Sequence, residues 1–420
     1  MKGTAILGAA LLAGQALAAG PGLDRKLAAI VADPARPLSG LAVLAVRDGK
    51  VAYTGQFGLA RIGPVPVPVT PRTMFRIASI SKMMTALGLM RLVEEGKVSL
   101  DEDIGAYLGY PVRNPHFPER SITLRHLLTH TSSLRDDAGY SWGAGVGLKD
   151  MLRGPAWAAQ APPGSYFSYC NLGWGVIGTV MERVTGERFD LLMRRLLLDP
   201  MGLRGGYNPS AFAPDEVADT ATLYRRRTTD TEVWNPAGPW IAQVDDFATR
   251  PPLPPAGIER YVPGTNATPF SPTGGLRISA GDLGKVMLML VDGGQHEGRR
   301  LLKPETLALM FAEHWRYDGT NGDTLGGLYH SWGLGVQRFA DFDGKGNRLV
   351  DGGRFTAVGH LGEAYGLIST FAVDLANRNG IVSLIGGVGN DPERDPGRYS
   401  AHTRAEEAVL TTLYRGAVAP

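Results

Sequence analysis

Ser79 and Lys82 form the pair of residues whose types and spacing most readily support chemistry. Apolar residues at the spacing of a buried helix face follow between Met83 and Met90, so the two residues share one face of a predicted helix. A serine at a helix N-terminus benefits from unpaired backbone N–H groups and from the helix dipole, and a lysine one turn later can take or relay its proton. The pattern predicts an activated nucleophile, and the alternative is a capping serine beside a solvated lysine.

A second candidate segment is the aromatic loop 162–175, which leads into another predicted helix. Tyr169 and Asn171 are two residues apart, so on an extended loop both side chains can point toward a common site. The alternative is a buried tyrosine bonded to the backbone and an asparagine that caps the helix. Cys170 lies between them and is predicted to point away, as a small buried residue rather than a second nucleophile.

His126 and His130 are four residues apart and raise the question of a metal site. No third ligand lies nearby in the sequence, and the chain has no H-E-x-x-H motif. We therefore interpret both histidines as structural and expect neither a metal nor a cofactor.

Composition and charge limit the classes of partner. The 420 residues are 44% hydrophobic and 20% charged, which suffices for a large core, and the net charge of +2 comes without a basic stripe. This argues against nucleic acid and anionic membranes as partners. A small-molecule substrate remains as the expected partner.

Residues 1–19 have the pattern of a secretory signal peptide, with a lysine, a short apolar segment and a small-x-small site. No later apolar run of about 18 residues occurs, so we expect no stable membrane insertion after cleavage. The expected location is the bacterial periplasm or the outside of the cell. With Cys170 as the single cysteine, stability must come from packing rather than disulfides.

The elements that must position these residues are predicted at both ends of the chain. A helix at 23–31 precedes two strands at 41–46 and 51–54 that are joined by an Asp-Gly turn, and the Ser79 helix should end near Gly96. Toward the C-terminus the sequence predicts a helix capped by Ser279 and a final helix at 404–414. Between them it predicts strands at 331–339, 368–373 and 381–385, with turns at 343–344 and 379–380.

This order predicts an α+β fold, in which the N- and C-terminal parts form one antiparallel sheet around a helical and loop-rich insertion. The sheet part covers about residues 20–75 and 325–420, and the inserted part covers about residues 76–324 of one domain, 20–420. Residues 135–147 are predicted to be a surface loop that forms one wall of a cleft. Residues 209–272 are read as long loops of undetermined topology.

Three short motifs together resemble those of the penicillin-recognising serine hydrolases. These enzymes include class C β-lactamases, D-alanyl-D-alanine carboxypeptidases, D-amino-acid amidases and peptidases, and carboxylesterases with a β-lactamase-like fold. The matches are Ser79-Ile80-Ser81-Lys82 to S-x-x-K, Tyr169-Cys170-Asn171 to Y-x-N, and His360-Leu361-Gly362 to K-T-G or H-x-G. Their order fits, and the resemblance covers nearly the whole mature chain, which implies a β-lactamase/transpeptidase-like fold.

The residue types then suggest roles in acyl transfer. Ser79 would attack, and Lys82 and Tyr169 would move its proton, with the lysine favouring the phenolate form of Tyr169. Which of the two is the base stays open, because they titrate as a pair. Asn171 would hold Lys82 or the substrate amide by hydrogen bonds.

The resemblance places the oxyanion hole at the backbone N–H groups of Ser79 and Glu363. Glu363 follows Gly362, and a glycine there would let the substrate backbone approach closely.

The third motif departs from K-T-G in two ways. His360 replaces a permanent cation with a group expected to be partly charged near neutral pH, and Leu361 removes a hydroxyl that would face a substrate carboxylate. Losing one charge-assisted hydrogen bond costs about 1.5–3 kcal/mol, so β-lactams and D-Ala termini should be held less well than neutral esters or amides.

The sequence therefore predicts an exported serine hydrolase that acts on a small ester, an amide or a D-amino-acid-containing peptide. The alternatives are a class C-type β-lactamase, a D-Ala-D-Ala carboxypeptidase, or a penicillin-binding sensor with little turnover. No G-x-S-x-G elbow is present, which argues against an α/β-hydrolase. The sequence does not predict the oligomeric state.

Overall fold

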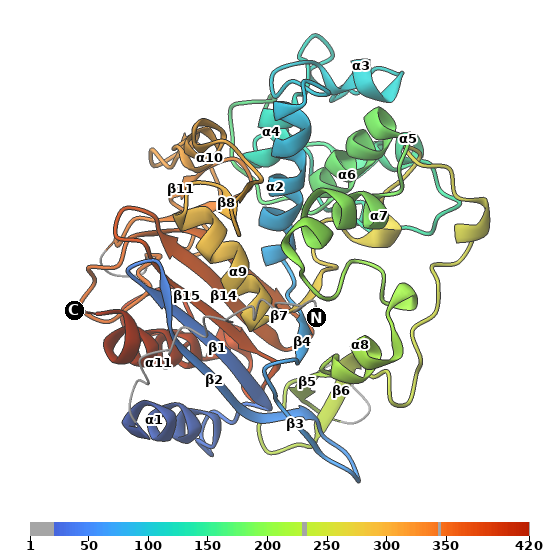
Figure 1. Ribbon diagram of the computed structural model, residues 1–420. Coiled ribbons are helices and arrows are strands. Elements are labelled where there is room, and N and C mark those ends of the chain that lie inside the picture. The colour runs from blue at the N-terminus through green and yellow to red at the C-terminus, as the bar shows by residue number, and fades with distance from the viewer. Residues whose placement is uncertain (1–20, 229–232, 343–345, 420) are drawn as a thin grey trace, which may run out of the picture.

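A nine-stranded antiparallel sheet forms the base of the protein (Figure 1). The computed structural model describes residues 21–228, 233–342 and 346–419, so the predicted signal peptide and the predicted turn at 343–344 lie outside the described residues. In spatial order the strands are β10 (Trp315–Arg316), β11 (Ser331–Trp332), β12 (Gln337–Phe339), β13 (Ala357–Ala364), β14 (Leu367–Asp374), β15 (Asn379–Ile385), β1 (Gly40–Arg47), β2 (Lys50–Arg61) and β3 (Val67–Pro68).

The sheet is covered on both faces, as the sequence of β1 requires. Successive β1 side chains alternate between two apolar clusters, with Leu41, Val43 and Ala45 in one and Ala42 and Leu44 in the other. Helices α1 (Pro21–Val31) and α11 (Arg404–Leu413) cover the first face, and α9 (Ala280–Val291) covers the second (Figure 1). The prediction of one antiparallel sheet built from both ends of the chain is confirmed.

Helix α2 (Ile80–Glu94) lies at the centre of the helical part, above the sheet in Figure 1. It is buried on nearly all sides, which explains why its sequence is apolar around most of the helix. The other helices of this part are α3 (Ile104–Leu108), α4 (Leu124–Leu128), α5 (Leu148–Met151), α6 (Leu172–Thr185), α7 (Phe189–Met193) and α10 (Pro304–Phe311). Helix α8 (Pro214–Asp219) lies apart from them, lower in Figure 1. No helix in the described ranges is long and apolar enough to cross a membrane.

Two details of the predicted C-terminal strands are wrong. The segment 331–339 forms two short strands, β11 and β12, because a turn at Gly333–Val336 reverses the chain between them. The predicted turn at 379–380 is the beginning of β15, and the chain instead turns just before it, where Arg378 has a φ of 55°.

Several short strands were not predicted from the sequence, among them two within the loop-rich segment 209–272. Strand β5 (Leu223–Arg226) pairs with β6 (Trp240–Val244) and, in parallel, with β16 (Gly387–Val388). Strand β4 (Met74–Arg76) pairs with β7 (Arg277–Ser279), so the residues just before Ser79 are fixed against a segment two hundred positions away. A further hairpin joins β8 (Gln295–His296) to β9 (Arg299–Arg300).

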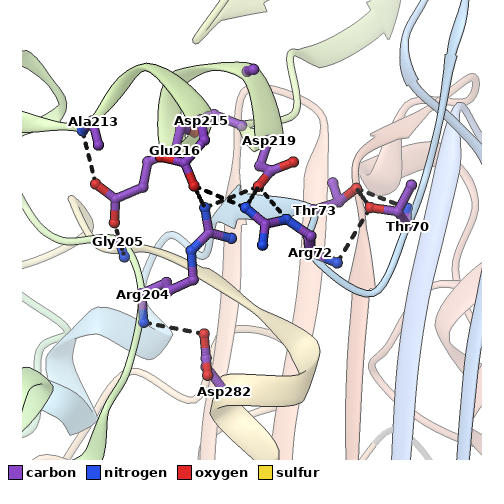
Figure 2. A network of polar contacts seen from close by, with 12 residues as sticks. Thr70, Arg72, Thr73, Arg204, Gly205, Ala213, Asp215, Glu216, Asp219 and Asp282 are labelled. Atoms are coloured by element: carbon purple, nitrogen blue, oxygen red, sulfur yellow. Dashed lines mark hydrogen bonds and ion pairs between the residues drawn. The ribbon is translucent and has the colours of Figure 1, made fainter.

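Two groups of arginine–carboxylate contacts hold this middle segment. In Figure 2, Arg72 and Arg204 share the carboxylates of Asp215 and Asp219, which attaches α8 to the connection before β4. Of these side chains, Arg72 and Asp215 are largely open to solvent, whereas Arg204 and Asp219 are partly buried. By contrast, both nitrogens of the Arg277 fork bond the carboxylate of Asp245 at 3.0 and 2.7 Å in the interior, where the two side chains are 7% and 2% exposed.

Replacing Asp245 by asparagine is expected to lower the free energy of unfolding by about 3–5 kcal/mol, because Arg277 then stays buried as an unpaired charge. Asparagine tolerates the positive φ of 59° at this position, so the backbone adds little to the effect. Asp215→Asn at the exposed pair of Figure 2 is the matched control and should change stability far less. Urea unfolding of the three proteins measures the difference, and equal losses in both variants would contradict it.

Candidate active site

Ser79 lies at the junction between β4 and α2, as the sequence predicts. It occupies the N-cap position of α2, yet its hydroxyl makes no capping hydrogen bond and remains available. The preceding Ala78 has a φ of 47°, an uncommon conformation for a residue with a Cβ, and such strain is typical of functional turns. The Ser79 N–H has no hydrogen-bond acceptor in the part of the chain that the structure describes.

Lys82 is completely buried directly beside Ser79. Its Nζ atom donates to Ser79 Oγ at 2.9 Å, to Asn171 Oδ1 at 2.7 Å and to the carbonyl oxygen of Thr273 at 3.0 Å. None of these partners is charged. Burial therefore lowers the pKa of Lys82 to about 7, although the negative charge of Asp136 acts in the opposite direction. Lys82 can thus lose its proton near neutral pH.

Asp136 fixes the second motif at the N-terminus of α6. Its carboxylate accepts hydrogen bonds from the backbone N–H groups of Asn171 and Leu172 at 2.9 Å and from Asn171 Nδ2 at 2.8 Å. A carboxylate is favoured at a helix N-terminus. Asn171 is consequently held with its Oδ1 toward Lys82, and Asp136 rather than Asn171 supplies the cap that the alternative interpretation assigned to the asparagine.

Thr273 closes the third side of the Lys82 site. Besides its carbonyl contact with Lys82, its hydroxyl donates to Asn171 Oδ1 at 2.7 Å. The surrounding loop is fixed to α2, because Thr85 donates to the carbonyl oxygen of Pro272 and Ser81 Oγ accepts from Leu276 N–H. The loop therefore belongs to the same rigid unit as Ser79.

Tyr169 lies against the same lysine, packed between two other rings. The Lys82 Nζ atom is 4.9 Å from the centroid of its ring, and the rings of His130 and Tyr329 stack on it with centroids 4.4 and 5.4 Å away. Burial and the neighbouring Tyr329 raise the pKa of Tyr169 well above its usual value, although contact with Ser79 lowers it. The expectation that Lys82 favours the phenolate is therefore wrong, because burial outweighs the nearby cation.

His360 lies in β13 beneath the site rather than on its wall. Its Nδ1–H donates to the carbonyl oxygen of Leu361 at 2.6 Å, while Nε2 is buried and has no hydrogen-bond partner among the described residues. Burial, reinforced by the charge of Lys82, lowers the pKa of His360 to about 3. The expectation of a partly charged imidazole near neutral pH is wrong, because the ring has no solvent and no acidic partner that would stabilise the cation.

Gly362 brings β13 into direct contact with the Ser79 turn. A Cβ atom at this position would lie 2.4 Å from the carbonyl oxygen of Ile77 and 3.1 Å from the backbone nitrogen of Ser79. A side chain cannot fit, so glycine is required by this close approach. The next residue, Glu363, is thereby placed at the cleft beside Ser79.

The predicted residues meet in a cleft of about 590 Å³. Ser79, Tyr169, Asn171, Gly362 and Glu363 line it, whereas Lys82 and His360 lie behind its surface. Leu361 also lines the cleft, where a K-T-G motif would present a hydroxyl. Within the predicted wall 135–147, Tyr140 lines the cleft, whereas Asp136 points inward to α6.

The remaining candidates have structural contacts. Cys170 is buried, its Sγ atom lies 3.4 Å from Asp136, and burial raises the pKa of its thiol, so it is not an activated nucleophile. His126 completes the cap of α4, and His130 Nδ1 accepts from Cys170 N–H at 3.0 Å. No group of three or more possible metal ligands occurs within the described residues.

Sequence reasoning missed three contributors: Asp136, Thr273 and Tyr329. Each acts through a position that no local pattern encodes, because each lies in a loop that only the fold brings to Ser79. The one available signal was the Gly274-Gly275 pair directly after Thr273, which marks a tight turn at the site.

Known proteins are similar to this chain in sequence. The beta-lactamase family model matches residues 23–405. Penicillin-binding protein 4* of Bacillus subtilis is 28% identical over 169 residues, which are 38% of this chain and 36% of that protein. Esterase EstB of Burkholderia gladioli is 33% identical over 187 residues, which are 40% of this chain and 47% of that protein. The matched regions thus span less than half of either relative.

The fold is also shared with a solved structure. The D-amino acid amidase of Ochrobactrum anthropi, in complex with D-phenylalanine, superimposes with a TM-score of 0.64 at 19% identity and covers 94% of this chain and 99% of that one. At this identity the likeness establishes the fold alone.

The geometry predicts how fast Ser79 reacts with a fluorophosphonate probe at different pH values. Below about pH 7 the rate of labelling should fall about tenfold per pH unit, because protonated Lys82 cannot accept the Ser79 proton, and above pH 7 it should level off. Asp136→Asn should move the inflection to lower pH, since the charge of Asp136 raises the pKa of Lys82.

Two variants control this measurement. His360→Asn should leave the inflection in place, because the pKa of His360 is about 3. Glu182→Gln should also leave it in place, although burial raises the pKa of Glu182 to about 7, since Glu182 bonds Phe189, Tyr261 and Gly264 rather than Ser79 or Lys82. An inflection that disappears in either variant would contradict the assignment to Lys82.

Proposed function

The chain belongs to the beta-lactamase family, and on that premise we propose that it is a serine hydrolase that forms an acyl-enzyme on Ser79 and hydrolyses an ester or a peptide-like amide. One observation carries the proposal. The Nζ atom of a fully buried lysine with a pKa near 7 lies 2.9 Å from Ser79 Oγ, at the floor of an open cleft.

In the proposed acylation, neutral Lys82 accepts the Ser79 proton while Ser79 Oγ forms a bond to the substrate carbonyl carbon. The proton then passes, directly or through Tyr169, to the oxygen of the departing alcohol or the nitrogen of the departing amine. The bond between that atom and the carbonyl carbon breaks at the same time. A water molecule then attacks the carbonyl carbon of the acyl-enzyme and gives a proton to Lys82. The bond between that carbon and Ser79 Oγ breaks, Lys82 returns the proton to Ser79 Oγ, and the carboxylic acid product leaves. Because Tyr169 is a neutral phenol at neutral pH, it serves here as a donor that is reprotonated by Lys82.

The charge that develops on the carbonyl oxygen would be stabilised by the backbone N–H groups of Ser79 and Glu363. Support for this comes from the unpaired Ser79 N–H and from the close contact of Gly362 with the same turn. Asn171 orients Lys82 through its Oδ1 atom. It also lines the cleft, where it would contact the substrate.

The third motif supports neutral esters or amides over β-lactams. His360 is buried and neutral, and Leu361 offers no hydrogen bond, so β13 presents no cationic or hydroxyl group for a carboxylate at the usual K-T-G position. A β-lactamase, a carboxypeptidase or an acylated sensor are the alternatives. Export to the periplasm or medium also remains part of the proposal and rests on the pattern of residues 1–19.

Ser79→Ala is expected to abolish both hydrolysis of p-nitrophenyl butyrate and labelling by a fluorophosphonate, because the acyl-enzyme cannot form. Ser81→Ala is the matched control, since Ser81 Oγ bonds the N–H of Leu276 and faces away from the cleft. Mass spectrometry of the labelled protein locates the adduct. Full hydrolysis by Ser79→Ala would show that the nucleophile is wrongly assigned.

Turnover of p-nitrophenyl butyrate should exceed turnover of nitrocefin by at least about tenfold in kcat/KM, from the missing carboxylate contact at Leu361. Leu361→Thr should narrow the difference by restoring the hydroxyl. Steady-state rates for both substrates and both proteins test this. A reversed order would favour the β-lactamase alternative, and one equivalent of product without turnover would favour the sensor.

A further inference from the structure

Arg76 is a charged residue of the cleft that the proposed reaction does not use. It ends β4, three residues before Ser79, and lines the same cleft. Its Nε–H donates to the carbonyl oxygen of Gly274 at 3.1 Å, and its guanidinium carbon lies 5.0 Å from the centroid of the Tyr365 ring. These two contacts fix the plane of the guanidinium.

The terminal nitrogens of Arg76 are left without a protein partner. Neither nitrogen bonds an acceptor within the described residues, and neither is closed off from the cleft. Burial and the like charge of Arg277 lower the pKa of Arg76, and the charge of Asp245 raises it. The carboxylate of Asp245 is already bonded by Nε and Nη2 of Arg277. The end of the Arg76 guanidinium therefore offers two parallel N–H groups, the arrangement that binds a carboxylate at two points.

The position of Arg76 relative to Ser79 is set by the loop that also holds the catalytic lysine. The carbonyl that anchors Arg76 belongs to Gly274, and the preceding residue, Thr273, binds Lys82. Elsewhere in the cleft, burial and the neighbouring carboxylates of Glu406 and Glu393 raise the pKa of Glu363, although the charge of Arg225 lowers it. Arg225 also lines the cleft, but its charge acts on Glu363 there, so the surroundings of Arg76 are the more favourable place for a negatively charged group.

We propose that Arg76 is a specificity-determining residue that binds a carboxylate carried by the ester or amide substrate, a conclusion that rests on the proposed function. This site differs from the K-T-G position, because Arg76 lies against Tyr365, beyond the end of β13. Exposed apolar side chains line the same cleft, with Tyr365, Tyr140 and Leu325 exposed by 40%, 45% and 64%. The substrate thus combines a carboxylate with an apolar portion.

The test compares matched ester pairs that differ only in a carboxylate. The mono-p-nitrophenyl esters of succinate, glutarate and adipate are set against neutral p-nitrophenyl esters of equal chain length, and 4-acetoxybenzoate is set against its methyl ester. In Arg76→Gln the ratio of kcat/KM for the charged to the neutral member should fall by about ten- to a hundredfold for at least one pair, mostly through KM. The same ratio for Arg76→Lys should lie between those of the wild type and Arg76→Gln.

Arg260→Gln controls for the loss of one positive charge, because Arg260 is 87% exposed and lies outside the cleft. Its ratios should equal those of the wild type, and rising ionic strength should lower the wild-type ratio but not that of Arg76→Gln. Equal loss of both members of every pair in Arg76→Gln, or no change in any ratio, would overturn the role of Arg76 while leaving the Ser79 reaction intact. Absence of hydrolysis of every ester by the wild type, together with absence of fluorophosphonate labelling at Ser79, would overturn both proposals.

Discussion

The burial of Lys82 among uncharged acceptors is the constraint on which the site depends. An ammonium group without a carboxylate partner is costly in the interior, and the cost is met by giving up the proton near neutral pH. Three oxygen atoms that belong to Ser79, Asn171 and Thr273 must converge on one nitrogen to make this tolerable. Helix α2, the start of α6 and the loop before β7 are therefore fixed relative to one another, and the cleft follows from their junction.

Asp136 shows how a charge can serve this site without pairing with the lysine. A direct salt bridge would keep Lys82 protonated, because an adjacent negative charge raises the pKa of a lysine. The carboxylate is instead bonded to the N-terminus of α6, with Asn171 between it and Lys82. Backbone N–H groups stabilise the Asp136 charge, and the same carboxylate orients Asn171. The charge of Asp136 raises the pKa of Lys82, but less than burial lowers it.

The sequence was sufficient wherever a short-range pattern determines the structure. The spacing of Ser79 and Lys82 on a helix, and of Tyr169 and Asn171 on a loop, placed four side chains correctly, and the alternation in 41–46 identified a central strand. It was insufficient where long-range contacts decide. Asp136 and Thr273 come from loops whose course depends on the whole fold, and β5 pairs with a strand more than 160 positions away.

His360 illustrates the same limit in chemical terms. Its type alone suggested a group that titrates near neutrality, yet its surroundings include the Lys82 charge, the rings of Trp332 and Tyr169, and one carbonyl oxygen. Two basic groups in one dry pocket cannot both be protonated, so each lowers the affinity of the other for a proton. The floor of the cleft therefore carries no positive charge once Lys82 loses its proton near neutral pH, whereas Arg76 and Arg225 line the cleft itself. On the proposed function, this separation of Lys82 and Tyr169 from Arg76 would allow the same pocket to hold a reactive neutral amine and to bind an anionic substrate.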